Sequence, residues 1–164
     1  MKSLLIVGAG QFGQLVKELA ELLGYEKIGF LDDNSESAVG KTADYWSFIE
    51  EYTDFIVAIG NPVIRKSVVE MLEHDYNLCN LIHPTAVISK SAHLSKGCII
   101  EANVVINAES KVGKSSLLNA GSVINHNARV NQYSQIDCNA VVSANAVVPE
   151  GAKVESCTVW SKRG

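Results

Sequence analysis

Three glycines near the N-terminus have the spacing of a phosphate-binding turn. They lie in Gly8-Ala9-Gly10-Gln11-Phe12-Gly13, directly after an apolar run at residues 3–7. Glycine lets the backbone turn tightly and approach a phosphate, and a helix that starts there offers unpaired N–H groups and a positive dipole end. The motif predicts a site for a phosphorylated ligand. The alternative is a tight strand-to-helix turn that binds nothing.

Two further loops carry polar groups suited to a nucleotide. Asp32 and Asp33 end the second apolar run, about 20 residues after the glycines, where a carboxylate meets a ribose in dinucleotide-binding folds. Gly60-Asn61 ends the third. Residues 1–80 are too short for the two complete halves of a dinucleotide site, so a mononucleotide-type ligand fits better than NAD.

The elements that position these loops alternate between strands and helices. Residues 3–7, 27–31 and 54–59 are apolar runs typical of buried parallel strands. A stretch with leucines at helical spacing follows the glycines, and residues 63–73 are expected to form a second helix. The pattern predicts an α/β, Rossmann-like domain over residues 1–80.

The second half of the chain is a six-residue repeat, which is the sequence signature of a parallel β-helix. Each hexad is expected to form a short strand and a turn, and three hexads close one triangular coil. A small or modest side chain stands two residues before each aliphatic position. The aliphatic positions are Ile88, Leu94, Ile100, Ile106, Val112, Leu118, Ile124, Val130, Ile136, Val142, Val148 and Val154. The repeat predicts an all-β domain over residues 81–164.

The phase of the repeat distinguishes the histidines. His126 lies two residues after an inward aliphatic, and the residues one coil away, Ala108 and Ala144, are both small. Its imidazole is therefore expected on an edge of the prism with open space around it. His93 lies one residue before its aliphatic, so the two histidines do not stack, and we expect no metal site.

Composition excludes several classes of function. The net charge is −4, and no cluster of Lys and Arg appears, so a nucleic-acid partner is not expected. The N-terminal apolar run is too short for a signal segment or a membrane span. The four cysteines show no Cys-x-x-Cys spacing and are expected as reduced thiols. These features predict a cytoplasmic protein without membrane insertion.

Together these motifs resemble the bacterial nucleotide-sugar and sialic-acid acetyltransferase family. The similarity rests on the glycine turn and on the segments 30–33, 57–61, 80–84 and 118–126. Within the family, the chain is most similar to enzymes that N-acetylate a UDP-linked 4-amino sugar in surface glycan synthesis. The resemblance implies a Rossmann-like unit followed by a left-handed β-helix, acetyl-CoA as co-substrate, a UDP-sugar as substrate, and a homotrimer.

The resemblance also implies a role for individual residues. His126 would be the catalytic base, a role suited to a group that titrates near neutrality. Gln135, Ala144 and Ser156 would contact acetyl-CoA. The nucleotide-sugar would lie against a larger set, formed by Gly8, Gly10, Gln11, Asp32, Asp33, Gly60 and Asn61.

Two positions depart from the family pattern. The residue after the catalytic histidine is usually acidic, whereas here it is Asn127, and a second family histidine aligns with Gln135. Three alternatives stay open beside the N-acetyltransferase, the last of them motivated only by the glycine motif and Asp32-Asp33. They are a non-catalytic trimeric relative that binds sugar nucleotides, a sialic-acid-type O-acetyltransferase, and an NAD-binding protein.

Overall fold

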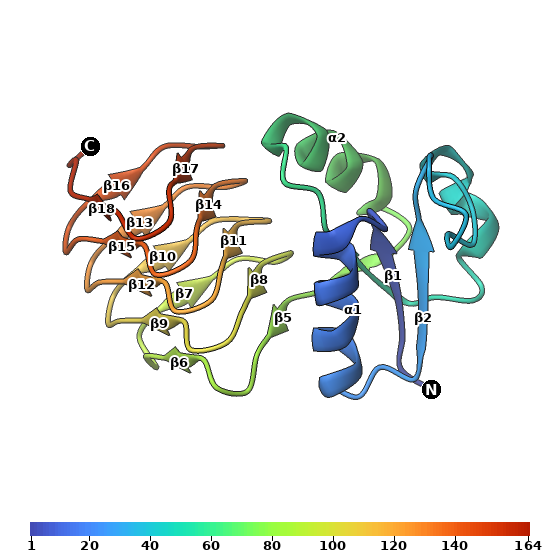
Figure 1. The fold of residues 1–164 in the computed structure, drawn as a ribbon, viewed down its shortest axis with the longest axis horizontal. Coiled ribbons are helices and arrows are strands. Elements are labelled where there is room, and N and C mark those ends of the chain that lie inside the picture. Colours follow the sequence, from blue (N-terminus) through green and yellow to red (C-terminus); the bar gives the residue numbers. More distant parts are fainter. The chain divides into compact units, whose positions relative to one another are not determined.

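A computed structural model describes residues 1–164, and the chain divides into two compact units (Figure 1). The first unit is Met1–Cys79 and the second is Asn80–Gly164. Each has its own secondary structure and its own core.

The first unit is a small parallel sheet with helical connections. Its four strands lie in the order β2-β1-β3-β4, so the first strand is central. The strands are β1 (Ser3–Val7), β2 (Lys27–Leu31), β3 (Asp54–Val57) and β4 (Asn77–Leu78). They are connected by α1 (Gln11–Leu22), the 3₁₀ helix η1 (Thr42–Phe48) and α2 (Pro62–Leu72). The sequence does not predict η1.

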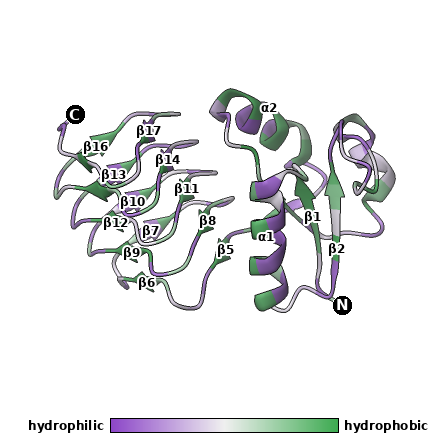
Figure 2. Ribbon diagram, in the orientation of Figure 1, coloured by the Kyte–Doolittle hydropathy of each residue, from purple (hydrophilic) through white to green (hydrophobic).

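The central strand is apolar because both of its faces are covered. All five residues of β1 are buried, which is typical of a strand in the middle of a parallel α/β sheet. Helix α1 carries both hydrophobic and hydrophilic residues (Figure 2). It buries Val16, Leu19 and Ala20, whereas Leu15 and Leu22 are exposed. The sheet thus fixes the carboxyl ends of β1, β2 and β3 at one edge, where the three polar loops begin.

The second unit is a left-handed parallel β-helix with three faces. The first face is β5 (Leu81–Ile82), β8 (Ile99–Ile100), β11 (Leu117–Leu118), β14 (Gln135–Ile136) and β17 (Lys153–Val154). The second face is β6 (Val87–Ile88), β9 (Val105–Ile106), β12 (Val123–Ile124), β15 (Val141–Val142) and β18 (Val159–Trp160). The third face is β7 (His93–Leu94), β10 (Lys111–Val112), β13 (Arg129–Val130) and β16 (Val147–Val148).

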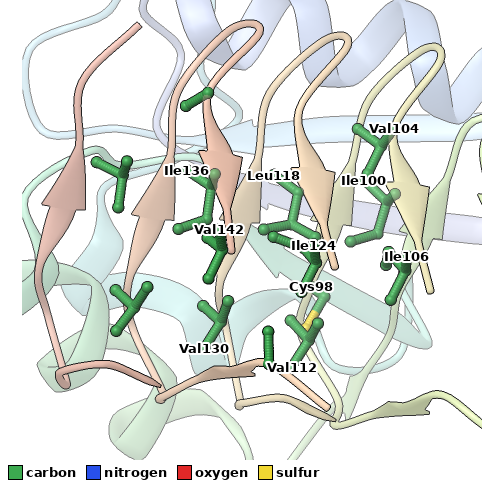
Figure 3. Close-up of a cluster of buried hydrophobic side chains, with 14 of the residues drawn as sticks. Cys98, Ile100, Val104, Ile106, Val112, Leu118, Ile124, Val130, Ile136 and Val142 are labelled. Atoms are coloured by element: carbon green, nitrogen blue, oxygen red, sulfur yellow. The ribbon is translucent and has the colours of Figure 1, made fainter. Parts of the chain in front are cut away.

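Residues 18 positions apart stack in register from one coil to the next. Val123, for example, pairs with Val105 below it and Val141 above it. The second residue of each strand points into the prism, where the aliphatic side chains form continuous columns (Figure 3). Ile100, Ile124 and Ile136 have no exposed surface. The hexad positions therefore build one core along the whole prism.

The coils turn at three corners that need a left-handed backbone conformation. The second residue of most turns has a positive φ, such as 56° at Asn127 and 54° at Asn139. Glycine and Asn tolerate this region best among the residue types, since most side chains crowd the backbone there. This requirement explains why Asn recurs at the corners.

The structure confirms the predicted fold class, an α/β unit followed by a β-helix. It also extends the repeat in both directions. Leu81–Ile82 already pairs with Ile99–Ile100, one hexad before the first expected one, and Trp160 pairs with Val142 at the other end. The indole Nε1 of Trp160 donates to the carbonyl oxygen of Val147 at 2.9 Å. Neither α1 nor α2 has the length and apolar character needed to span a bilayer.

Candidate functional site

The glycine turn places the start of α1 at the edge of the sheet. Gly8 follows β1 with φ 104°, a conformation that L side chains rarely adopt. A Cβ at Gly13 would overlap the carbonyl oxygen of Gly8, so this glycine lets helix and turn approach closely. Gly10 is the N-cap of α1, has no capping side chain, and has open space where its Cβ would be. The helix thus presents uncapped N–H groups beside free space, which suits a phosphate.

The carboxylate of Asp32 connects the glycine turn to the loop after β2 through two hydrogen bonds. Its Oδ2 accepts a hydrogen bond from the N–H of Ala9 at 2.8 Å, and its Oδ1 accepts one from the N–H of Asn34 at 2.9 Å. These backbone donors lower the pKa of Asp32 below its usual range, because they stabilise the charged form. Asp33 accepts from the N–H of Thr42 at 2.9 Å. Both carboxylates therefore order the loop after β2, and the lowered pKa of Asp32 favours a negative charge there.

The loop after β3 is held by α2. The side chain of Asn61 accepts from the N–H groups of Val63 and Ile64 and so caps the helix. The guanidinium of Arg65, which is 1% exposed, donates to the carbonyl oxygens of Ile59 at 2.6 Å and Gly60 at 2.9 Å. No spacing in the sequence indicates this role for Arg65, because both acceptors are backbone atoms. Unlike α1, α2 already has its first N–H groups satisfied.

A pocket of about 400 Å³ opens between these loops. Of the residues expected to bind the nucleotide-sugar, it is lined by Gly8, Asp32 and Asp33. The others lie at the two helix starts, Gly10 and Gln11 at α1 and Gly60 and Asn61 at α2. The rest of the pocket lining is Leu31, Asn34, Thr42, Ala43, Ile59, Ile64, Val68 and Met71. The pocket has an acidic rim, an apolar floor and no lysine or arginine.

His126 lies at the corner between the second and third faces of the β-helix. It follows β12 by two residues and is exposed. Its neighbours in the same corner column are Ala108 and Ala144, so no bulky side chain stands above or below the imidazole. The N–H of Asn127 donates to the carbonyl oxygen of Ala108, and that of Asn145 to the carbonyl oxygen of His126. The backbone bonds between coils fix the position from which the ring projects.

The hydrogen bonds around His126 involve asparagines. The backbone N–H of His126 donates to Oδ1 of Asn125 at 2.8 Å. The same oxygen also accepts a hydrogen bond from Nδ2 of Asn107 at 3.3 Å. The ring Nδ1 of His126 lies 3.2 Å from Nδ2 of Asn127. No carboxylate bonds to the ring. His126 therefore has an amide partner in place of the usual acid.

The three residues expected at acetyl-CoA lie on different sides of the prism. Ala144 is directly above His126 in the same corner column. Gln135 is in β14 on the first face, and Ser156 is at the corner between the first and second faces. Within one chain only Ala144 adjoins the histidine.

The remaining histidines and cysteines do not gather. His93 is in β7 on the third face, and no three residues among His, Cys, Asp and Glu come together as a metal-binding group. All four cysteines are free, and burial raises the pKa of Cys79 and Cys98 to about 11. Buried thiols of this kind are poor nucleophiles at neutral pH.

Comparison with known proteins finds similarity to a family model and to a curated protein. The model of the PglD N-terminal domain matches residues 3–72. A curated protein of Bacillus subtilis (strain 168), UDP-N-acetylbacillosamine N-acetyltransferase, is 31% identical over 115 residues. This match covers 62% of the chain, which spans about half (52%) of the length of that relative.

Solved structures match nearly the whole chain. The acetyltransferase domain of PglB from Neisseria gonorrhoeae FA1090 in complex with acetyl coenzyme A is 31% identical, with a TM-score of 0.90. That match covers 96% of this chain and 81% of the other. A mutant of GDP-perosamine N-acetyl transferase from Caulobacter crescentus in complex with CoA and GDP-perosamine has a TM-score of 0.77 at 22% identity, over 97% and 91% of the two chains. The latter likeness shows the fold alone.

Proposed function

The chain belongs to the nucleotide-sugar acetyltransferase family, and we propose that it transfers the acetyl group of acetyl-CoA to the amino group of a nucleotide-linked amino sugar. The observation that carries this proposal is the exposed His126 in a corner column of alanines. Two relatives support it. The Neisseria domain was solved in complex with acetyl coenzyme A, and the Bacillus relative is named for N-acetyl transfer to a sugar nucleotide.

His126 acts as the general base. The sugar amine attacks the carbonyl carbon of the thioester, and the imidazole takes the proton that the amine loses as the C–N bond forms. The negative charge that develops on the carbonyl oxygen needs hydrogen-bond donors, which backbone N–H groups of adjacent coils supply. The C–S bond then breaks, and the proton passes to the leaving thiolate of CoA. The protein ends the cycle in its starting protonation state.

The first unit binds the nucleotide part of the acceptor. Its diphosphate lies at the uncapped start of α1, near Gly10 and Gln11, where N–H groups and the helix dipole favour an anion. The base enters the 400 Å³ pocket, whose acidic rim at Asp32 and Asp33 accepts hydrogen bonds from a base with N–H donors. Uracil has one such donor at N3, and guanine also has N–H donors, so the nucleotide is assigned from the Bacillus relative, which is named for a UDP-linked sugar. We therefore assign a UDP-linked 4-amino sugar as acceptor.

The second face of the β-helix forms a homotrimer. Its outward residues are all valines, Val87, Val105, Val123, Val141 and Val159, and the two outermost are 63% and 67% exposed. On the third face the corresponding residues include Lys111 and Arg129, which are charged and exposed. An uncharged, β-branched sheet face of this length favours a second copy of the chain over water. His126 lies at its border, so the trimer places the base at the rim of an interface.

Release of thiol from acetyl-CoA tests the function. Purified protein is given UDP-linked and GDP-linked 4-amino sugars, and the wild type is compared with His126→Ala and with His93→Ala, an exposed histidine outside the site. We expect turnover with the UDP-linked amine and a fall of roughly 10²–10⁴ in His126→Ala, the usual effect of losing a general base. His93→Ala keeps the wild-type rate.

Four outcomes contradict parts of the proposal. Binding of UDP-sugar without turnover would mean that the chain is a non-catalytic sugar-nucleotide-binding protein. Turnover only with the GDP-linked sugar would overturn the assigned nucleotide, and acetylation of a hydroxyl in place of the amine would make the chain an O-acetyltransferase. A monomer by light scattering would remove the shared site.

A further inference from the structure

The third face of the β-helix carries basic residues in one column. The outward residues of β7, β10 and β13 are His93, Lys111 and Arg129, which pair in register from coil to coil. All three are exposed, whereas the inward residues Val112 and Val130 are each 1% exposed. Because neighbouring strands lie about 4.8 Å apart, the lysine and the arginine start from adjacent positions. The acetyl transfer proposed above assigns no role to either of them.

These two cations have no counter-charge within the chain. The side chains of Lys111 and Arg129 form no ion pair and no hydrogen bond. In contrast, Lys153 has the same outward position on the first face, and it forms ion pairs with Asp137 at 3.2 Å and with Glu155 at 3.0 Å. Like charges at facing positions of neighbouring strands destabilise a sheet. An anion from outside the chain would offset this repulsion.

A pocket of about 410 Å³ lies beside the column. It follows the third face and the turns between the third and first faces, where Lys114 also lines it. The side chains of Ser95 and Asn131 line the pocket and form no hydrogen bond within the chain. Gln132 donates one N–H of its amide to Oε2 of Glu150 at 3.0 Å. The pocket thus combines cations with hydroxyl, amide and carboxylate groups.

This pocket is separate from the residues assigned to acetyl transfer. His126 lies at the corner between the second and third faces, whereas the turns that line the pocket lie at the corner between the third and first faces. The nucleotide pocket of the first unit shares no residue with it. We therefore treat it as a second binding site with a ligand of a different kind.

The lining indicates a small anion that carries hydroxyl groups. No aromatic residue lines the pocket, and Val112 and Val130 point inward, so a nucleobase has no apolar surface on which to stack. A guanidinium binds two phosphate oxygens in parallel, and an ammonium adds a point charge. Sugar hydroxyls both donate and accept, so they can pair with the amides of Asn131 and Gln132 and with the carboxylate of Glu150. The volume is larger than a phosphate needs and is typical of small-molecule sites.

We propose that the third face binds a sugar phosphate, with the phosphate on Lys111 and Arg129 and the sugar hydroxyls along the turns at Ser95, Asn131 and Gln132. This class of ligand explains why one pocket holds both unpaired cations and a carboxylate. A phosphate alone would be repelled by Glu150, whereas a sugar hydroxyl donates to it. Binding here does not require acetyl transfer, so a failure of the proposed function leaves this inference standing.

Calorimetric titration of the intact protein tests the site. The ligands are glucose 1-phosphate, glucose 6-phosphate and N-acetylglucosamine 1-phosphate, with glucose and inorganic phosphate for comparison. We expect at least one sugar phosphate to bind more tightly than phosphate, and glucose to show no binding. No binding of any sugar phosphate would overturn the proposal, and so would an equal affinity for phosphate alone.

The same titration with UDP or acetyl-CoA at saturation distinguishes this pocket from the sites of the reaction. We expect the sugar phosphate to bind with unchanged affinity in the presence of either one. Displacement by UDP or by acetyl-CoA would assign the bound anion to a substrate site and would overturn the proposal.

Arg129→Gln and Lys111→Gln separate binding from folding. Each removes one charge, and we expect the affinity for the sugar phosphate to fall by roughly tenfold or more, because charge-assisted hydrogen bonds are lost. Since repulsion within the column is relieved, the melting temperature of each unliganded variant should equal or exceed that of the wild type. The matched control is Lys153→Gln, which makes the same change on the first face and should retain the affinity.

Three results with these variants would overturn the proposal. The first is a wild-type affinity in Arg129→Gln. The second is an equal loss of affinity in Lys153→Gln, which would show an effect of net charge rather than of this pocket. The third is a lower melting temperature in both Arg129→Gln and Lys111→Gln, which would show that the two cations have partners within the fold.

Discussion

Nδ1 of His126 lies 3.2 Å from Nδ2 of Asn127, and this amide is the only side chain that bonds to the imidazole. An amide carries both a donor and an acceptor, so by rotating it pairs with either tautomer of the ring. A carboxylate at the same place would hold Nδ1–H and favour the charged ring. The pair therefore sets the tautomer of the base less strictly than an acidic neighbour would.

Asn127→Asp tests this relationship. Aspartate tolerates the left-handed backbone at this corner, where φ is 56°. Its charge stabilises the protonated imidazole, so a higher pH is needed to free the base. We expect the acid limb of the kcat/KM profile to move to higher pH. Asn103→Asp, at a corner with φ 59°, is the control that should leave the profile in place.

Gly13 and Gly10 separate the packing of the glycine turn from its binding role. Gly13→Ala forces a methyl group onto the carbonyl of Gly8, so we expect a lower melting temperature and loss of UDP binding. Gly10→Ala meets no atom within 4 Å and should fold normally, but its methyl group stands in the space beside the uncapped N–H groups. Calorimetric titration with UDP should therefore show weaker binding for Gly10→Ala at an unchanged melting temperature. Unchanged affinity would show that the phosphate does not bind at the start of α1.

Two buried serines of the prism core differ in their hydrogen bonding. The hydroxyl of Ser122 has no partner, whereas that of Ser134 donates to the carbonyl oxygen of Pro149 at 2.7 Å. Ser134→Ala should lower the free energy of unfolding by about 1 kcal/mol, while Ser122→Ala should leave it unchanged or raise it. Thermal melts at equal protein concentration compare the two. A loss of equal size in both variants would show that the Ser122 hydroxyl has a partner in solution.

Asp32 makes the first unit sensitive to acid. Its pKa is lowered by the N–H groups of Ala9 and Asn34, so its stabilising effect is complete above the ordinary Asp pKa of about 3.9 and is lost as the pH falls through the lower folded value. We expect the melting temperature of the wild type to fall more steeply in this range than that of Asp32→Asn. Glu36→Gln removes a charge from the same loop and should retain the steep fall.

The sequence predicts most of the fold because each element has a visible period. The hexads mark the inward positions of the prism, and the three apolar runs mark three of the four strands of the first unit, with β4 lying outside them. The ends of the repeat are harder to place, since Leu81–Ile82 precedes the regular hexads and Trp160 breaks the aliphatic pattern. The 3₁₀ helix η1 has no periodic signal. Its start is fixed by the bond from Thr42 to Asp33, which only the folded loop reveals.

The sequence predicts which residues belong to the site, but it does not predict which atoms they bond to. The spacing of Asp32 after the glycines indicates a loop carboxylate, yet that both of its oxygens bind backbone N–H groups depends on how two loops meet. The bond from Gln135 to Asn119 is diagonal across 16 residues and depends on side-chain rotamers, so no spacing rule would find it.

The regular stacking of coils has an evolutionary consequence. A corner position inside the prism has equivalent positions one coil above and one coil below, at which a side chain projects from the same corner in the same direction. A histidine that moved from 126 to 144 or 108 would shift the base by one strand spacing, roughly 4.8 Å, without any change in the main chain. Point substitutions can therefore move the base along the prism axis in steps of one coil, and so match its position to acceptors of different length.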